Sequence, residues 1–163
     1  MIQKKICLLG ASGVGKTSLI RQYIEGIFSE KYLTSIGVKI DKKLVQLDHE
    51  LVQLLIWDLE GIDRYCGFQP RYLRGTAACA VVVDQTRPQS LTDGINILKK
   101  IRKVTPAPTI LVINKTDLIP SWQASEQKFE IESSDFTGVF NTSAKTGFQV
   151  EEMFAFIAQQ SVQ

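Results

Sequence analysis

GASGVGKT, the sequence of residues 10–17, decides the fold because it matches the pattern G-x-x-x-x-G-K-[ST] of a phosphate-binding loop. Gly10 and Gly15 let the backbone turn tightly enough for successive N–H groups to point inward at phosphate oxygens. Lys16 is expected to reach the β- and γ-phosphates, and the Thr17 hydroxyl is expected to ligate Mg²⁺. A glycine-rich turn without a ligand does not need Lys and Thr in this order. We therefore predict that this phosphate loop (residues 10–17) binds a nucleoside polyphosphate.

The segments on either side of the phosphate loop fit a strand and a helix. Residues 6–9 are a short apolar run that ends directly at Gly10, as is typical of a buried parallel strand. Beyond the loop, Leu19, Ile20 and Tyr23 fall at helical spacing, which predicts a helix over residues 15–25. The N-terminal dipole of such a helix favours a bound anion. The order strand, glycine-rich loop, helix is the arrangement that the motif requires.

Strand-like and helix-like segments alternate along the rest of the chain. They predict a three-layer α/β sandwich whose six-stranded, mostly parallel sheet has one antiparallel strand and helices on both faces. Taken with the phosphate-loop motif, this is a fold of the P-loop NTPase type. Strands are predicted at residues 6–9, 38–47, 51–59, 78–84, 109–114 and 139–141. Helices are predicted at residues 15–25, 91–104 and 150–160, and a short helix is an option at residues 122–129.

Turn signals and the absence of linkers complete the prediction of the fold. Asp48, His49 and Glu50 are typical of a turn, so the second and third strands are expected to form an antiparallel hairpin. His49 at this tip is interpreted as a solvated turn residue rather than a catalytic one. No repeat or linker divides the chain, so residues 1–163 are predicted to form a single domain.

The composition fits one soluble domain, with 163 residues of which 44% are hydrophobic. The net charge of +2 is too small to indicate nucleic acid or an anionic membrane surface as a partner. The three cysteines (Cys7, Cys66 and Cys79) form no paired framework and no metal-binding spacing. Cys7 and Cys79 lie in apolar runs and are expected to be small buried residues. Unpaired thiols favour a reducing compartment, so we expect a cytoplasmic protein.

The ends of the sequence show no lipidation or export motif. Ile2 stands where N-myristoylation requires Gly, and residues 159–163 contain no cysteine for prenylation. No signal peptide is visible, and no apolar run approaches membrane-spanning length. We therefore expect no lipid anchor in this chain, with two alternatives left open: a soluble protein, or a chain that has lost a tail.

Two further loops specify the base of the nucleotide. Asn114, Lys115, Thr116 and Asp117 follow the apolar run 109–113, at the edge of the sheet where ligands bind in such folds. The Asp117 carboxylate can accept from both N1–H and the exocyclic amine of guanine, whereas adenine offers no such pair of donors. Asn114 is expected to tie this loop to the phosphate loop, and the Lys115 stem to cover one face of the base.

A second polar tetrapeptide supports the same base. Residues 142–145 read Thr-Ser-Ala-Lys and end another short strand, where the Ala144 N–H could meet guanine O6. Each tetrapeptide alone also fits a polar turn at a strand end. Three such loops at the ends of three strands, in this order, predict a guanine nucleotide.

Together these motifs resemble those of the Ras-like small GTPases, and most closely those of the Rab branch. The resemblance runs from Lys4 to Gln159. Besides the phosphate loop, its carriers are SIGV at residues 35–38, WDLEG at 57–61, NKTD at 114–117, TSAK at 142–145 and VEEMF at 150–154. It implies a Mg²⁺-dependent molecular switch that binds GTP and GDP. Such a switch signals to effector and regulator proteins through two loops, the first switch (residues 27–38) and the second switch (residues 61–75).

The resemblance also assigns site residues position by position. Phe28 matches the aromatic residue that packs against guanine. Ser35 matches the residue whose hydroxyl ligates Mg²⁺ and senses the γ-phosphate. Asp58 matches the acidic residue that holds Mg²⁺ through water. The Gly61 N–H matches the group that bonds the γ-phosphate. The residues expected to bind nucleotide are Gly10, Ser12, Gly13, Val14, Gly15, Lys16, Thr17, Ser18, Phe28, Ser35, Asp58, Gly61, Asn114, Lys115, Asp117, Ser143, Ala144 and Lys145. Catalysis is expected of Lys16, Ser35 and Gly61, and the Mg²⁺ ligands are expected to be Thr17, Ser35 and Asp58.

An effector-facing cluster is implied as well. Ile40, Trp57 and Tyr72 match the positions at which Rab proteins display aromatic residues to their effectors. For Trp57, a partly buried strand residue is an equally good interpretation.

The second switch departs from the family pattern. Ile62 stands where a Gln normally orients the attacking water, and an isoleucine side chain can neither donate nor accept a hydrogen bond. Hydrolysis is therefore expected to be slow unless Glu60, Asp63, Arg64 or a group from a partner substitutes. Glu60 replaces a small residue close to Mg²⁺, where it either swings outward or repels the triphosphate. By resemblance, Asp63 is expected to pair with Lys16 when the nucleotide leaves.

Three functional hypotheses follow from these observations. The first is a GTP/GDP switch and GTPase with slow intrinsic hydrolysis. The second is a module that binds guanine nucleotide with little or no turnover, which Ile62 and Glu60 favour. The third is the GTPase domain of a larger protein.

Overall fold

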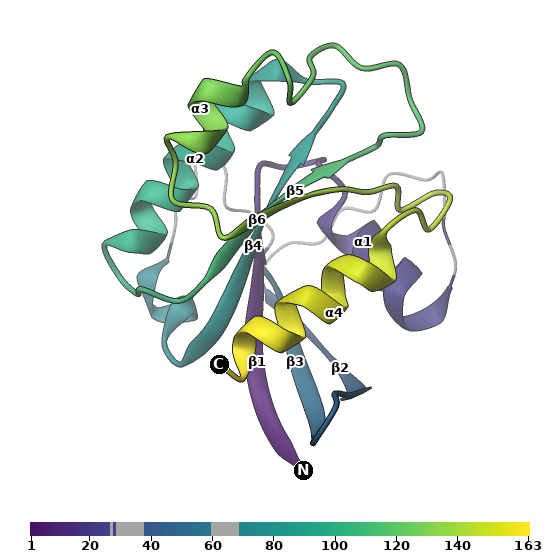
Figure 1. The fold of residues 1–163 in the computed structure, drawn as a ribbon, viewed down its shortest axis with the longest axis vertical. Helices are drawn as coiled ribbons and strands as arrows, with labels where there is room; N and C mark the ends of the chain where they lie inside the picture. Colours follow the sequence, from purple (N-terminus) through teal and green to yellow (C-terminus); the bar gives the residue numbers. More distant parts are fainter. Residues whose placement is uncertain (27, 29–37, 60–68) are drawn as a thin grey trace.

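The structure, a computed structural model, describes residues 1–26, 28, 38–59 and 69–163 (Figure 1). The strands of this part of the chain are β1 (Ile2–Leu9), β2 (Val38–Gln46), β3 (Leu51–Leu59), β4 (Thr76–Asp84), β5 (Thr109–Asn114) and β6 (Gly138–Asn141). The helices are α1 (Lys16–Glu25), α2 (Pro88–Arg102), α3 (Lys128–Glu132) and α4 (Val150–Ser161), with a short 3₁₀ helix η1 (Pro70–Leu73).

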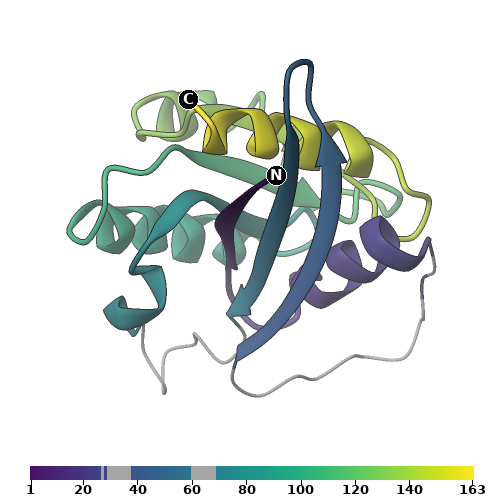
Figure 2. The same cartoon turned by 90° about the horizontal axis from the view of Figure 1, so that it is seen from below.

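The strands form one six-stranded sheet in the order β2-β3-β1-β4-β5-β6. β2 is antiparallel to β3, and every other neighbouring pair is parallel. β5 is buried at every position, which is why it reads as a continuous apolar run. β2 alternates between half-buried and exposed positions because it lies at the edge, where Figure 2 shows the β2–β3 hairpin as a long arm. The predicted fold class, including its one antiparallel strand, is confirmed.

Helices cover both faces of the sheet, with α1 and α4 on one side and α2 and α3 on the other (Figure 1). Leu8 and Phe154 belong to the core on the first side, where the Tyr23 ring stacks on Phe154 with centroids 4.0 Å apart. Val81 and Ile101 belong to the core on the second side. The molecule therefore has two apolar cores that meet at the parallel sheet, and its polar groups are left to the ends of the strands.

Most predicted boundaries lie within two residues of those in the structure, and three predictions differ more. β1 begins at Ile2 rather than at residue 6, because its polar first half is held by backbone pairing to β3, a contact without a hydrophobic signature. α2 begins at Pro88 rather than at residue 91, since proline fits the first turn of a helix. The optional helix at residues 122–129 is wrong: α3 spans Lys128–Glu132, and the buried Trp122 donates from Nε1 to the Asp84 carbonyl at 2.9 Å.

Two of the cysteines behave as the sequence predicts. Cys7 and Cys79 are buried, unbridged, and paired in register between β1 and β4. Burial raises the pKa of Cys7, and burial together with the neighbouring Cys7 thiol raises the pKa of Cys79 to about 12. Both thiols therefore stay protonated at neutral pH and act as small apolar side chains. Cys66 lies outside the described residues. Within the described ranges, no helix has the length and apolarity needed to cross a membrane.

Candidate nucleotide-binding site

The predicted site residues gather at one edge of the sheet. The phosphate loop follows β1, Asn114 ends β5, and residues 142–145 follow β6. Between them, β4 ends at Asp84, which lies in register with Asn114. Because the carboxyl ends of parallel strands share an edge, residues that are far apart in sequence meet here.

The phosphate loop turns from β1 directly into α1. Gly15 caps the helix with φ 103°, a left-handed conformation that favours glycine. A Cβ atom at Gly15 would lie 2.3 Å from Asn114 Nδ2, so the loop and Asn114 leave no room for a side chain. Lys16 is fully buried, and its Nζ donates to the carbonyls of Gly10 at 2.9 Å and Ala11 at 3.2 Å. The ammonium group thus lies within the turn of the loop.

Asn114 joins three loops through its side chain. Its Nδ2 donates to the Val14 carbonyl at 3.0 Å. Its Oδ1 accepts from the Ala144 N–H and from the Thr142 hydroxyl, each at 3.2 Å. The predicted tie between the Asn114 loop and the phosphate loop is confirmed, and it extends to the loop after β6.

Lys115 reaches the same loop from the other side. Its backbone has φ 67°, which costs a residue with a side chain about 1–2 kcal/mol. Its Nζ donates to the Gly13 carbonyl at 2.9 Å and pairs with Asp84 Oδ2 at 2.9 Å. Burial alone would raise the pKa of Asp84, but hydrogen bonds from Thr86 and Lys115 lower it below its usual range. The Asp84 carboxylate is therefore ionised at neutral pH beside the lysine.

Asp117 is exposed and faces the loop after β6. The buried Ser143 hydroxyl donates to Asp117 Oδ1 at 2.8 Å, which fixes the orientation of the carboxylate. Gln22 of α1 supports the same loop by donating to the Ala144 carbonyl at 2.8 Å. A loop held by hydrogen bonds and an oriented carboxylate suit the recognition of a base edge.

Thr17 and Asp58 form an oxygen-rich corner at the start of α1. The Thr17 hydroxyl donates to Asp58 Oδ2 at 2.5 Å, and Asp58 is buried. A hydroxyl and a carboxylate are hard oxygen donors of the kind that Mg²⁺ prefers, usually with phosphate and water oxygens completing its shell. In the described part of the chain, no cluster of three or more His, Cys, Asp or Glu side chains is placed to hold a metal. The two oxygen donors of this corner fit a Mg²⁺ ion whose shell is completed by phosphate and water oxygens.

Some predicted site residues lie outside the described ranges, and for four others the structure gives the exposure. Ser35 and Gly61 fall on residues that the structure does not describe, as do Glu60, Ile62, Asp63 and Arg64. Phe28 is described and is 38% exposed. Ser18 is half-buried on α1, whereas Ser12 and Lys145 are exposed.

Comparison with models of protein families matches residues 5–163 to the Ras family. The chain belongs to the Ras family. Among its relatives, the human Ras-related protein Rab-22A is 33% identical over 159 residues, which cover 96% of this chain and 82% of that protein. The human Ras-related protein Rab-31 is 33% identical over 163 residues, with the same coverage. Within the Ras family the chain is therefore most similar to the Rab branch.

Members of the Ras family share a general activity, the binding and hydrolysis of GTP. Ras and Rab proteins bind GTP and GDP with Mg²⁺ and hydrolyse GTP, so this chain is a GTP-binding molecular switch and a GTPase. Interaction with effector and regulator proteins is part of the same family property.

Three residues of this Ras-family site escape the sequence analysis: Gln22, Asp84 and Arg87. Asp84 carries a usable signal, since it is a charged residue that ends an apolar strand. Arg87 lies just beyond it, and its Nη2 donates to the Ser12 carbonyl at 2.8 Å. Gln22 has no such signal, because its partner on the loop after β6 is distant in sequence.

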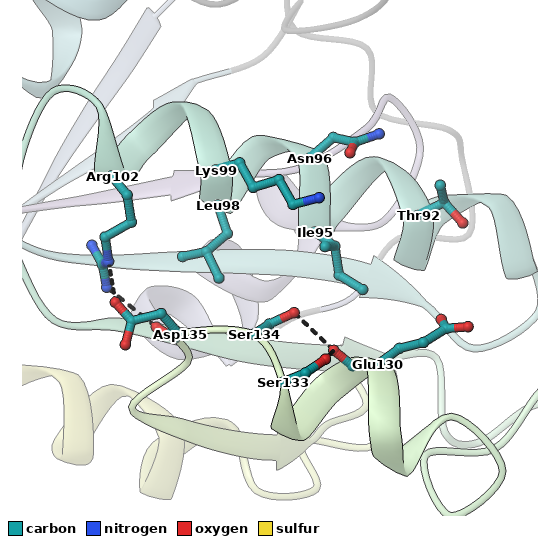
Figure 3. Close-up of a pocket in the computed structure, with 10 residues that line it drawn as sticks. All are labelled: Thr92, Ile95, Asn96, Leu98, Lys99, Arg102, Glu130, Ser133, Ser134 and Asp135. Atoms are coloured by element: carbon teal, nitrogen blue, oxygen red, sulfur yellow. Dashed lines mark hydrogen bonds and ion pairs between the residues drawn. The ribbon is translucent and has the colours of Figure 1, made fainter.

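A hollow in this Ras-family chain lies apart from the nucleotide site. It has a volume of about 670 Å³ and lies between α2 and the segment around α3. Figure 3 shows Ile95, Leu98 and Arg102 along one side, with Glu130 and Asp135 on the other. None of the predicted nucleotide-binding residues lines this hollow. The loops at the carboxyl edge of the sheet, rather than this hollow, are the candidate site.

Proposed function

We propose that residues 1–163 act as one domain in which the phosphate loop holds the phosphates of GTP or GDP. The single observation that carries this assignment is the Asn114 side chain, which joins the phosphate loop to the loop after β6. The Lys16 ammonium lies within the turn of the loop, and a bound polyphosphate would exchange its carbonyl contacts for phosphate oxygens. The N-terminus of α1 adds a favourable dipole.

Guanine would lie between the Asp117 loop and residues 143–145. The carboxylate held by Ser143 would accept from N1–H and the exocyclic amine. The Ala144 N–H, which now donates to Asn114 at 3.2 Å, would be shared with guanine O6. The Lys115 stem and Phe28 would cover the faces of the base.

The Mg²⁺ ligands would be Thr17 and Ser35, with Asp58 acting through water. The Thr17–Asp58 hydrogen bond supports this assignment, because it places two of these three groups side by side. When bound, Mg²⁺ would offset the charge of the β- and γ-phosphates. Binding of the γ-phosphate by Ser35 and Gly61 would order the two switches, which is how nucleotide identity becomes a signal.

The face formed by β2 and β3 is proposed to meet effectors. Ile40 is 48% exposed and lies opposite Trp57 in the antiparallel ladder, so the two side chains share one face. The Trp57 ring is half-buried under Lys5, whose Nζ lies 3.7 Å from the ring centroid. Tyr72 is partly buried against the second core. Trp57 is thus a partly buried strand residue. Its pairing with the exposed Ile40 also supports its place in the effector-facing cluster.

Slow intrinsic hydrolysis is the part of the proposal that depends on Ile62. A side chain without a hydrogen-bonding group leaves the attacking water unoriented, and positioning is most of what a protein contributes to phosphoryl transfer. A guanine-nucleotide-binding module with little or no turnover is the second candidate, because Ile62 and Glu60 depart from the family in the same loop. Action in the cytoplasm is proposed from the unbridged thiols of Cys7 and Cys79.

Ile62→Gln is expected to raise the single-turnover rate of GTP hydrolysis by about tenfold or more, since the amide can orient the water. The measurement is the rate of phosphate release from preloaded, Mg²⁺-bound GTP. Ile2→Gln makes the same chemical change at the start of β1 and is expected to leave the rate unchanged.

Cell extract is then added to the unsubstituted protein, and the rate of phosphate release is measured again. Strong stimulation supports a catalytic group from a partner, whereas no turnover in any arm would leave the binding module as the function.

A further inference from the structure

Asp84 is a buried carboxylate that neither the phosphate loop motif nor the guanine motif includes. It is 1% exposed and lies at the end of β4. Its Oδ1 accepts from the N–H and the hydroxyl of Thr86, at 2.8 and 2.7 Å. Its Oδ2 accepts from Arg87 Nε at 3.1 Å and from Lys115 Nζ at 2.9 Å. One buried anion therefore holds two cations from different loops.

Both cationic side chains also donate hydrogen bonds to backbone carbonyls of the phosphate loop. Arg87 Nη2 donates to the Ser12 carbonyl at 2.8 Å, and Lys115 Nζ donates to the Gly13 carbonyl at 2.9 Å. The next carbonyl, that of Val14, accepts from Asn114 at 3.0 Å. Three consecutive carbonyls of the loop are thus each held by a side chain from outside it.

This arrangement determines where the N–H groups of the loop point. The peptide bonds of the described residues are trans, and in a trans peptide the C=O and N–H point in opposite directions. Donors that hold the carbonyls of Ser12, Gly13 and Val14 therefore turn the next three N–H groups to the opposite side. Glycine backbones have little preference of their own, so a loop of this composition depends on outside contacts for its conformation.

We propose that Asp84 and Arg87 are positioning residues for the bound nucleotide: Asp84 orients Arg87, and Arg87 holds the Ser12 peptide with its N–H side toward the phosphates. The inference rests on the proposed function, because it assumes that the phosphate loop binds the phosphates. Arg87 suits this role because its planar guanidinium presents donors at fixed angles to two acceptors at once. Its side chain is 47% exposed, so solvent screens its charge and the contribution is mainly geometric.

Release of a fluorescent GDP analogue tests the role of Arg87. With excess unlabelled GDP and saturating Mg²⁺, Arg87→Ala is expected to release the analogue about tenfold faster. This ratio equals about 1.4 kcal/mol and lies near what one hydrogen bond contributes. Arg87→Lys is expected to be nearly as fast as Arg87→Ala, because one ammonium cannot occupy both donor positions. Asp84→Asn should release the analogue faster still, since it loosens both cations.

Arg102→Ala is the matched control. Arg102 is the last residue of α2, the helix that Arg87 immediately precedes. It pairs with Asp135 at 2.6 Å, donates to the Ala107 carbonyl at 2.7 Å, and lines the hollow away from the phosphate loop (Figure 3). It is expected to release the analogue at the unsubstituted rate. Phosphorus NMR of bound GDP is the second readout, and it should change for Arg87→Ala but not for Arg102→Ala.

Three outcomes would overturn the inference. Release at the unsubstituted rate from Arg87→Ala, or from Arg87→Lys, would show that the bridge from Asp84 to Ser12 does not position the nucleotide. Equal acceleration by Arg102→Ala would show that general loss of stability is the cause. Failure of the unsubstituted protein to retain any guanine nucleotide would instead reject the proposed function, and the inference with it.

Discussion

Asp117→Ala is expected to lower the affinity for GDP by about 10²- to 10⁴-fold. The substitution removes two hydrogen bonds to a charged group, each contributing about 1.5–3 kcal/mol. Because Asp117 is exposed and its partner Ser143 also accepts from the Thr146 N–H at 3.1 Å, the fold should tolerate the change. The measurement is the dissociation constant for GDP by titration, with the melting temperature as a check on folding.

Asp117→Asn is the matched variant for the same carboxylate. An amide still accepts from N1–H, but its NH₂ group faces the exocyclic amine of guanine with two donors opposed. Xanthine carries a carbonyl at that position, so this variant is expected to prefer the diphosphate of xanthosine to GDP. Retention of GDP by Asp117→Ala within about threefold of the unsubstituted affinity would contradict the assignment of the guanine contact.

Gly15→Ala is expected to have the second large effect, because the loop has no space for a methyl group. The new Cβ would lie 2.3 Å from Asn114 Nδ2, and φ 103° is strained for alanine. Strain of about 1–3 kcal/mol and loss of the Asn114–Val14 hydrogen bond, about 1 kcal/mol, should both destabilise the fold. The melting temperature should then fall by about 5–15 °C for a domain of this size. The variant should also be purified without nucleotide, because Asn114 joins three loops of the site.

Gly26→Ala separates conformational strain from crowding. Gly26 has φ 68°, but a Cβ there would meet nothing within 4 Å. This variant should lose about 1–2 kcal/mol of stability and keep its nucleotide. If Gly15→Ala matched Gly26→Ala in both melting temperature and nucleotide content, the close approach of Asn114 to the loop would not matter for nucleotide binding.

Much of the fold is predictable from the sequence because buried parallel strands have a strong signature. The strand that ends at Asn114 has the predicted bounds, since every residue in it is buried and four of the six are apolar. The early start of β1 at Ile2 is not predictable in this way, because its polar residues are held by pairing with β3. The segment around Trp122 is misjudged for a related reason: a buried tryptophan there contacts the Asp84 carbonyl rather than one face of a helix.

In the candidate site, residues of known motifs are predictable from the sequence, whereas the residues that support them are not. Motif residues such as Lys16 and Asn114 are predictable because their chemistry requires particular side chains at particular spacings. Asp84 and Arg87 belong to no such pattern, and their particular partners are known only when the sheet places β4 beside β5. Such supporting contacts depend on distances across loops, which a single sequence does not reveal. A polar residue that closes a buried parallel strand, as Asp84 does, is the feature from which such contacts are best predicted.

The nucleotide content of the purified protein tests the central claim, guanine-nucleotide binding at the carboxyl edge of the sheet, most directly. The protein is denatured, and the released nucleotides are separated and quantified by ion-pair chromatography. We predict about one guanine nucleotide per chain, as GDP or GTP, from the single phosphate loop. Protein that is folded yet carries no nucleotide and binds none when GDP and Mg²⁺ are added, or that carries adenine nucleotides instead, would contradict the account.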